Sequence, residues 1–224
     1  MERRSEKVKM VQVCQILQYE GLFDGFGHVT WRVDENEILS TPKMPPGFAT
    51  VEDIIHHDLE GNKLQGDKPF NGEQPLHLAI YQARSDVRCI IHYHPPAVIA
   101  LSVVGKEVVP VCNEGAYFYE GTPIYDDSSL LITMEKGLAV ANVLGDKNTV
   151  LLRGHGAIVV GDMMEKVCRL AVSLEKTAQI QIMAETIGTP KLHSVEEAKT
   201  LKSAEESEGG LQRFWAYYEN RLRF

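Results

Sequence analysis

Residues 87–96 read VRCIIHYHPP and carry the clearest strand pattern of the chain. The apolar side chains of this stretch alternate as in a buried strand, and its two prolines end a strand and suit the first turn of a helix. We therefore predict a strand over residues 87–94 and a short helix from there to Val104. Because side chains two residues apart on a strand project from the same face, His92 and His94 should point in one direction.

Helical and strand patterns alternate on both sides of this stretch. Amphipathic periodicity predicts helices, and short alternating apolar runs predict strands. The predicted helices cover residues 5–19, 75–84, 133–144, 162–187 and 208–224, and the predicted strands cover residues 27–33, 38–41, 54–59, 108–112 and 149–160. This alternation predicts an α/β sandwich around a mixed sheet. We expect residues 1–224 to form one domain, with the C-terminal helix packed on it or on a neighbouring subunit.

Length, composition and charge narrow the functional classes. The chain has 224 residues, of which 44% are hydrophobic and 24% are charged, as in a globular protein of one large domain. Its formal net charge of -8 gives no general attraction to nucleic acids or anionic membranes. The charged N-terminus lacks the apolar core of a signal peptide, and no apolar stretch is long enough to cross a bilayer. We therefore expect a cytoplasmic protein without a nucleic-acid or membrane partner.

Three histidines predict a metal site. Two imidazoles on one face of a buried strand are costly unless something binds them, and neutral imidazole is a good zinc ligand. Two separately hydrogen-bonded histidines are the alternative for this pair alone. His155 lies between Gly154 and Gly156 at a break in an apolar strand, where missing side chains allow the backbone to approach closely. Together with the pair, it would complete a three-histidine site with open coordination positions.

Glu73 is the candidate acid and base of this site. It lies just before the helix that begins at Pro75, so the positive end of that helix and a nearby cation would both favour its carboxylate form. A carboxylate beside a Lewis-acidic metal can move a proton on a bound substrate. The alternative is an ordinary glutamate of a first helical turn. His77, on the same helix, is interpreted as a surface residue or as one that supports the site from outside.

These residues, in this order, resemble the class II aldolase/adducin family over about residues 5–187. The motifs that carry the resemblance are Gly27-His28-Val29-Thr30-Trp31-Arg32, Gly72-Glu73, Ala83-Arg84-Ser85-Asp86-Val87, His92-Tyr93-His94-Pro95 and Leu151-Leu152-Arg153-Gly154-His155-Gly156. The resemblance implies a three-layer α/β/α sandwich around a central mixed, largely antiparallel sheet. It also implies a homotetramer with active sites at subunit interfaces and one divalent metal ion per subunit. That ion would be zinc, or alternatively Mn, Co or Fe, with His92, His94 and His155 as ligands and Glu73 as the acid/base.

The sequence differs from the sugar-phosphate aldolases of this family at positions that bind the substrate. The positions that hold the phosphate in those enzymes correspond here to His28, to the stretch Thr41-Pro42-Lys43-Met44-Pro45-Pro46-Gly47, from which Lys43 is the candidate, and to the pair Asn71-Gly72. Most of the hydroxyl donors of the phosphate site are therefore absent, which predicts an unphosphorylated substrate. We expect His28, Lys43, Asn71 and Gly72 to contact that substrate.

Two further positions are compared with the family. Arg153 would share the strand face of His155, where its guanidinium could hold a substrate carboxylate in a two-pronged fashion. A structural ion pair near a subunit interface is the alternative for Arg153. The aldolases also take a tyrosine from a neighbouring subunit, and Tyr117 and Tyr119 are the candidates for that role here.

The resemblance implies a divalent-metal-dependent carbon–carbon lyase that acts through a metal-stabilised enolate on a small hydroxy- or oxo-carboxylic acid. Family members with Gly-His-Val or Gly-His-Ile in the first motif and Arg-Gly-His-Gly in the last are similar to decarboxylases, so decarboxylation is the favoured reaction. Retro-aldol cleavage, including that of a sugar-phosphate aldolase or 4-epimerase, is the alternative. An adducin-like assembly module is the non-enzyme alternative, and the presence of all three histidines and Glu73 argues against it.

Overall fold

The computed structural model describes residues 3–222. Residues 1–2 of the charged N-terminus and residues 223–224 of the predicted C-terminal helix lie outside this range. The helices are α1 (Arg4–Tyr19), α2 (Gln74–Ala83), α3 (Pro96–Val103), α4 (Met134–Leu144), α5 (Met164–Ile187), α6 (Val195–Glu205) and α7 (Glu208–Leu222). Short 3₁₀ helices cover Pro46–Phe48, Val51–Asp53 and Asn113–Phe118. The strands are β1 (His28–Arg32), β2 (Ile38–Ser40), β3 (Ile55–His57), β4 (Lys63–Gln65), β5 (Cys89–Tyr93), β6 (Ile124–Tyr125), β7 (Thr149–Leu152) and β8 (Gly156–Gly161).

The strands form one sheet in the order β4-β3-β2-β1-β5-β8-β7-β6. Neighbouring strands are antiparallel except β6 and β7, which are parallel. The sheet is thus mixed and largely antiparallel, as predicted. In its centre, His92 of β5 lies opposite His28 of β1 on one side and Ile158 of β8 on the other. This register joins the first and second halves of the chain at β5.

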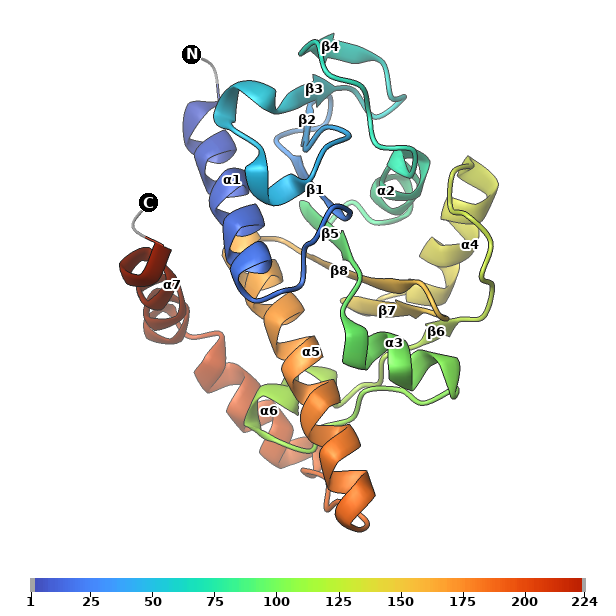
Figure 1. Ribbon diagram of the computed structural model, residues 1–224, viewed down its shortest axis with the longest axis vertical. Helices are drawn as coiled ribbons and strands as arrows, with labels where there is room; N and C mark the ends of the chain where they lie inside the picture. Colours follow the sequence, from blue (N-terminus) through green and yellow to red (C-terminus); the bar gives the residue numbers. More distant parts are fainter. Residues whose placement is uncertain (1–2, 223–224) are drawn as a thin grey trace.

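Helices cover both faces of the sheet, as Figure 1 shows, and the predicted three-layer α/β/α sandwich is confirmed. Cys89, Ile91 and Tyr93 of β5 pack in the core on the side of α1 and α5. Ile90 packs in the core on the side of α2 and α4. Because β5 is covered on both faces, apolar residues occupy both alternating sets of positions. His92 shares the parity of Ile90 and therefore faces α2.

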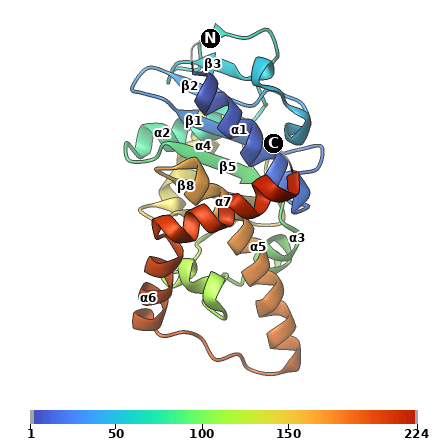
Figure 2. The ribbon, with the colours of Figure 1, turned by 90° about the vertical axis from the view of Figure 1, so that its left-hand side faces the viewer.

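The C-terminal helix α7 lies on the same face of the sheet as α1 (Figure 2), where it packs against α1 and α5. Tyr218 is buried there, and its hydroxyl donates to Oε1 of Glu20 at 2.7 Å. Phe214 packs edge-on against Tyr218 with 5.0 Å between the ring centroids. Within residues 3–222, none of the helices combines the length and the apolar character that a membrane span requires.

The predicted strand over residues 108–112 is wrong, because these described residues form an irregular segment. The N–H of Val108 donates to the hydroxyl oxygen of Thr122 at 2.8 Å, so a side chain takes the place of a neighbouring strand. Pro110 has no N–H to offer to a sheet. Apolar alternation alone therefore does not make this segment a strand.

Candidate metal centre

His92 and His94 meet at the carboxyl end of β5. Their Nε2 atoms lie 3.2 Å apart, and their rings make an angle of 82°. His92 is fully buried, and its Nδ1 lies 3.1 Å from the carbonyl oxygen of Ala157. Because a carbonyl oxygen can only accept a hydrogen bond, Nδ1 of His92 donates, and Nε2 of the neutral ring keeps its lone pair. This is the tautomer that a metal ligand needs.

His155 comes from the turn between β7 and β8. Its ring centroid lies 4.9 Å from that of His92 and 5.2 Å from that of His94. Each of the three rings offers one ligand nitrogen, and these nitrogens lie within 4.8 Å of one another. Gly154 has a φ of 68°, a left-handed conformation that favours glycine. A Cβ at Gly156 would lie 2.3 Å from the carbonyl oxygen of Tyr93. The turn can therefore approach β5 only because residue 156 has no side chain.

Glu73, the N-cap residue of α2, reaches the same point. Its Oε2 lies 3.3 Å from Nε2 of His92 and 3.3 Å from Nε2 of His28, and its Oε1 lies 3.7 Å from Nε2 of His155. The N–H of Glu73 donates to Oδ1 of Asn71 at 3.1 Å, which fixes the chain just before the helix. Burial raises the pKa of Glu73 and the facing imidazole of His28 lowers it, and the net direction is a pKa below the ordinary value.

Burial also favours the neutral form of His94 and His155, the less buried histidines of the cluster. Burial and the neighbouring His92 and His155 lower the pKa of His94 to about 4, and burial lowers the pKa of His155 as well. The lone pair of Nε2 of His92 points at a small region that the carboxylate of Glu73 also faces. Such groups repel one another unless a cation lies among them. This donor set therefore fits a divalent cation such as zinc, and three imidazoles leave coordination positions open.

The structure places His28 in the same cluster and gives partners to both of its ring nitrogens. Nδ1 lies 2.8 Å from Nε2 of His77, and Nε2 faces Glu73. Nδ1 of His77 lies 2.7 Å from Oγ1 of Thr30, which lies 2.8 Å from the hydroxyl oxygen of Tyr81. His77 is buried, so its interpretation as a surface residue is wrong and its interpretation as a supporting residue agrees with these contacts.

Sequence reasoning missed the part that Thr30 and Tyr81 take in this network. The available signal is spacing: His77 and Tyr81 are four residues apart on a helix, while His28 and Thr30 are two apart on a strand. Each spacing puts both side chains on one face. The sequence pattern does not indicate that this face of β1 packs against this face of α2.

Asn71, Gly72 and Lys43 are also expected to bind substrate. Asn71 and Gly72 directly precede Glu73, and a Cβ at Gly72 would lie 3.8 Å from the side chain of Ile132. Lys43 is exposed, and its backbone N–H donates to the carbonyl oxygen of Pro69 at 3.0 Å. Their contacts with a substrate stay a prediction.

Arg153 lies two residues before His155, at the start of the turn. Its Nε donates to Oδ1 of Asp126 in an ion pair whose side chains are 42% and 78% exposed. The guanidinium thus has a partner within the chain, as its structural interpretation expects. A substrate role for Arg153 requires that a carboxylate compete with this exposed ion pair.

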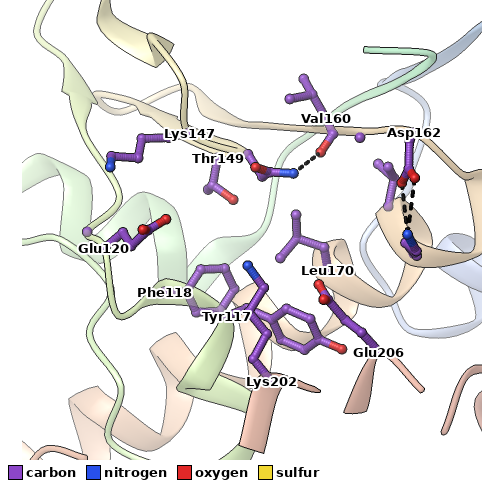
Figure 3. A pocket seen from close by; sticks show the side chains of 15 residues that line it. Tyr117, Phe118, Glu120, Lys147, Thr149, Val160, Asp162, Leu170, Lys202 and Glu206 are labelled. Atoms are coloured by element: carbon purple, nitrogen blue, oxygen red, sulfur yellow. Dashed lines mark hydrogen bonds and ion pairs between the residues drawn. The ribbon is translucent and has the colours of Figure 1, made fainter. Parts of the chain in front are cut away.

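Tyr117 and Tyr119 lie away from the histidine cluster, near the opposite ends of strands β7 and β8. Tyr117 lines a cavity of about 200 Å³ together with Thr149 and Gly161 (Figure 3). Thr149 begins β7 and Gly161 ends β8, whereas the turn that carries His155 joins the opposite ends of these strands. Tyr117 is therefore separated from the histidine cluster of its own chain by the length of β8, about 17 Å. A role for either tyrosine in a neighbouring subunit stays a prediction.

Comparison with known proteins gives consistent matches. The family described as Class II Aldolase and Adducin N-terminal domain matches residues 8–182. The 3,4-dihydroxyphthalate decarboxylase of Arthrobacter keyseri is 30% identical over 192 residues, which are 78% of this chain and 77% of that protein. The L-fuculose phosphate aldolase of Methanocaldococcus jannaschii is 28% identical over 183 residues, which are 80% of this chain and 96% of that protein.

Among solved structures, the L-fuculose 1-phosphate aldolase from Glaciozyma antarctica PI12 superposes with a TM-score of 0.84. The match covers 98% of this chain and 90% of that chain, at 24% sequence identity. This likeness shows the fold, and both sequence relatives named above are lyases.

Proposed function

Since the chain belongs to the class II aldolase and adducin family, we propose that it is a metal-dependent lyase that breaks a carbon–carbon bond of a small hydroxy- or oxo-carboxylic acid. Decarboxylation is the favoured reaction. The observation that carries the proposal is the meeting of three imidazoles, with ligand nitrogens within 4.8 Å of one another, beside the carboxylate of Glu73. The names of the decarboxylase and aldolase relatives support the class of reaction.

We assign His92, His94 and His155 as the ligands of one divalent ion per subunit, with zinc favoured over Mn, Co and Fe. When bound, the ion supplies a Lewis acid that stabilises the negative charge developing on an enolate oxygen of the substrate. The hydrogen bond from Nδ1 of His92 to Ala157 holds that ring in the tautomer required for ligation.

Glu73 is assigned to proton transfer. Glu73 is a carboxylate at rest and first takes up a proton from solvent. When the carboxyl group of the substrate leaves as CO₂, the bonding electron pair stays on the substrate carbon. Glu73 delivers its proton to that carbon and returns to the carboxylate form. Its side chain is 14% exposed, so it is shielded from bulk water and still open on the side of the cluster.

Product analysis tests the reaction. Metal-loaded protein is incubated with a panel of hydroxylated aromatic acids and aliphatic 2-oxo and hydroxy acids, and CO₂ and aldehydes are measured. We expect CO₂ without an aldehyde fragment. Retro-aldol cleavage is the second candidate, favoured by the match to the aldolase of Methanocaldococcus jannaschii, and it would release an aldehyde without CO₂. A sugar-phosphate aldolase or 4-epimerase should in addition be inhibited by phosphoglycolohydroxamate.

Metal analysis separates the enzyme from an adducin-like assembly module. We expect one ion per chain after metal-replete expression and loss of the ion in His92→Asn. The control His193→Gln changes a histidine in the connection before α6, so it should keep the ion. Less than about 0.2 ions per chain in the unchanged protein would favour the assembly module.

We also propose that the chain forms a homotetramer with active sites at subunit interfaces. Large apolar side chains are exposed beside the cluster: Phe26 is 70% exposed with its ring centroid 6.4 Å from that of His94, and Ile132 is 50% exposed near Gly72. Covering such side chains is a common reason for association. Sedimentation equilibrium tests this proposal, and a monomer at micromolar concentration would contradict it.

A further inference from the structure

A chain of hydrogen-bonding side chains runs from Glu73 into the layer between β1 and α2. Its successive members are Glu73, His28, His77, Thr30 and Tyr81, and the distances between their polar atoms are 3.3, 2.8, 2.7 and 2.8 Å. His28 and Thr30 come from one face of β1, and His77 and Tyr81 come from one face of α2. The members beyond Glu73 are buried.

The hydrogen bonds in this chain must all run in one direction. A neutral imidazole has one N–H and one lone pair, and a hydroxyl group has one proton to donate. His28 and His77 are 4% and 1% exposed, and such burial disfavours the charged form of an imidazole. Each ring therefore accepts at one nitrogen and donates at the other. Reversing a single bond would place two protons or two lone pairs against each other.

The carboxylate of Glu73 sets that direction, because it can only accept. His28 then donates from Nε2 to Glu73, and its Nδ1 accepts the Nε2–H of His77. Nδ1 of His77 accepts the hydroxyl proton of Thr30. The oxygen of Thr30 accepts the hydroxyl proton of Tyr81 in turn.

The opposite direction has its own end point. The hydroxyl oxygen of Tyr81 lies 3.1 Å from the carbonyl oxygen of Arg88, to which it would donate if every bond were reversed. In that arrangement, a neutral His28 would turn the lone pair of Nε2 toward the carboxylate of Glu73 and repel it. The carbonyl oxygen of Arg88 already accepts the N–H of Arg32 at 2.7 Å, so it does not depend on Tyr81.

We propose that His77, Thr30 and Tyr81 are positioning residues that hold His28 as its Nε2–H tautomer, so that a neutral imidazole donates a hydrogen bond to the carboxylate of Glu73. The orientation of Glu73 is thus controlled from the buried layer between β1 and α2. The significance of this chain for turnover rests on the proposed role of Glu73 as acid/base. The tautomers themselves do not depend on that role.

Neutron diffraction tests the tautomers directly. Crystals of the deuterated, metal-loaded protein at neutral pH should show deuterium on Nε2 and not on Nδ1 of both His28 and His77. The hydroxyl deuterium of Tyr81 should point to Thr30. Deuterium on Nδ1 of either ring, or a Tyr81 hydroxyl directed at Arg88, would overturn the proposal.

A matched pair of variants at Thr30 tests the consequence for catalysis. Thr30→Val keeps the shape and removes the hydroxyl group, whereas Thr30→Ser keeps the hydroxyl group. We expect Thr30→Val to lower kcat about fivefold to tenfold, the effect of one lost hydrogen bond, with KM and metal content changed less than about twofold. Thr30→Ser should retain kcat. A purely structural role would affect thermal stability without this separation of kcat from KM, and equal kcat values in the two variants would overturn the assignment.

These outcomes are distinguishable from failure of the proposed function. Normal turnover by Glu73→Gln would remove Glu73 from its role and leave the deuterium positions in the unchanged protein as predicted. Deuterium on Nδ1 of His28 would remove the positioning chain and leave the lyase activity to be judged by its products.

Discussion

Replacing Glu73 by Gln removes a negative charge and keeps the size of the side chain. Because three other side chains are assigned as metal ligands, we expect Glu73→Gln to keep its metal content while kcat falls by about two to four orders of magnitude, the scale of general acid–base catalysis. Elemental analysis and turnover at saturating substrate measure the two quantities. The exposed Glu52 offers the control Glu52→Gln, which should retain both. Near-normal turnover would contradict the assignment of Glu73.

Gly156 is expected to be intolerant of any side chain. A Cβ there would meet the carbonyl oxygen of Tyr93 at 2.3 Å and Cδ2 of His94 at 2.9 Å, so Gly156→Ala should separate the turn from β5. We expect metal affinity to fall about tenfold to a hundredfold, as measured by competition with a chelator. Gly188→Ala is the control, because a Cβ there meets nothing within 4 Å. Unchanged affinity in Gly156→Ala would show that the close approach is dispensable.

Individual residues differ in how far the sequence reveals their placement. The spacing of His92 and His94 and the glycines around His155 predicted side chains that could meet, and the structure brings them together. The location of His77 could not be predicted, because the burial of a helix face depends on which strand it covers. Its contact with Thr30 arises from tertiary packing of α2 on β1.

At the scale of elements, α3 is held by a carboxylate from α5. Glu175 is 4% exposed, and its Oε2 accepts the N–H of Ala97 at 3.0 Å and that of Val98 at 3.2 Å. These are N–H groups of the first turn of α3, which have no partner within the helix. Because α3 begins just after His94, Glu175 also fixes the segment that leads from the histidine cluster into this helix.

Removing the carboxylate of Glu175 should lower the free energy of unfolding more than removing an exposed carboxylate does. We expect Glu175→Ala to lower the free energy of unfolding by about 2–3 kcal/mol, since buried N–H groups lose charge-assisted hydrogen bonds, and Glu175→Gln to lower it less. Urea unfolding measures both. Glu185→Gln on the same helix loses an ion pair with Lys106 that is partly exposed, and should change stability by less than about 1 kcal/mol. Equal losses in Glu175→Ala and Glu185→Gln would refute this role.

Elements with a strong apolar period were predictable, whereas elements with little buried surface were not. The helix predicted over residues 5–19 corresponds to α1, and the one predicted over residues 133–144 corresponds to α4. No helix was predicted at α6, because most of its residues are charged or polar and its buried side chain is the small Ala198. Its capping box of Ser194 and Glu197 is a signal that could have revealed it.

For the molecule as a whole, we expect the metal-free protein to become more stable as pH rises from about 4 to about 6.5. Burial lowers the pKa of His28 to about 4 from an ordinary value of 6.5. In this window the unfolded chain binds more protons than the folded chain, so the free energy of unfolding increases with pH. His28 alone accounts for about 3 kcal/mol. The lowered pKa of Glu73 acts with the same sign below about 4.5.

Urea unfolding in the presence of EDTA, at several pH values in this window, measures the dependence. His28→Asn should make the profile less steep, and the lowered pKa values of His94 and His155 should keep the remaining slope positive. A profile for the unchanged protein that is flat or falls with pH would contradict the expectation.

The fold class was predictable because strand and helix patterns are distributed along the whole chain. We propose that residues 1–224 form one domain, and the packing of Tyr218 of α7 in the same core as α1 and α5 supports this. The pairing order was not predictable. The neighbours β5 and β8 are far apart in the chain, and local pattern carries no information about such contacts.

The position of β8 beside β5 also bears on biosynthesis. While the ribosome is still making the chain, β5 emerges with His92 and His94 well before the turn that carries His155 has been translated. A nascent polypeptide at that stage presents two imidazoles of the proposed three-histidine site, and two ligands hold a transition metal less tightly than three. The three imidazoles can meet only after the turn has been translated and β8 has paired with β5.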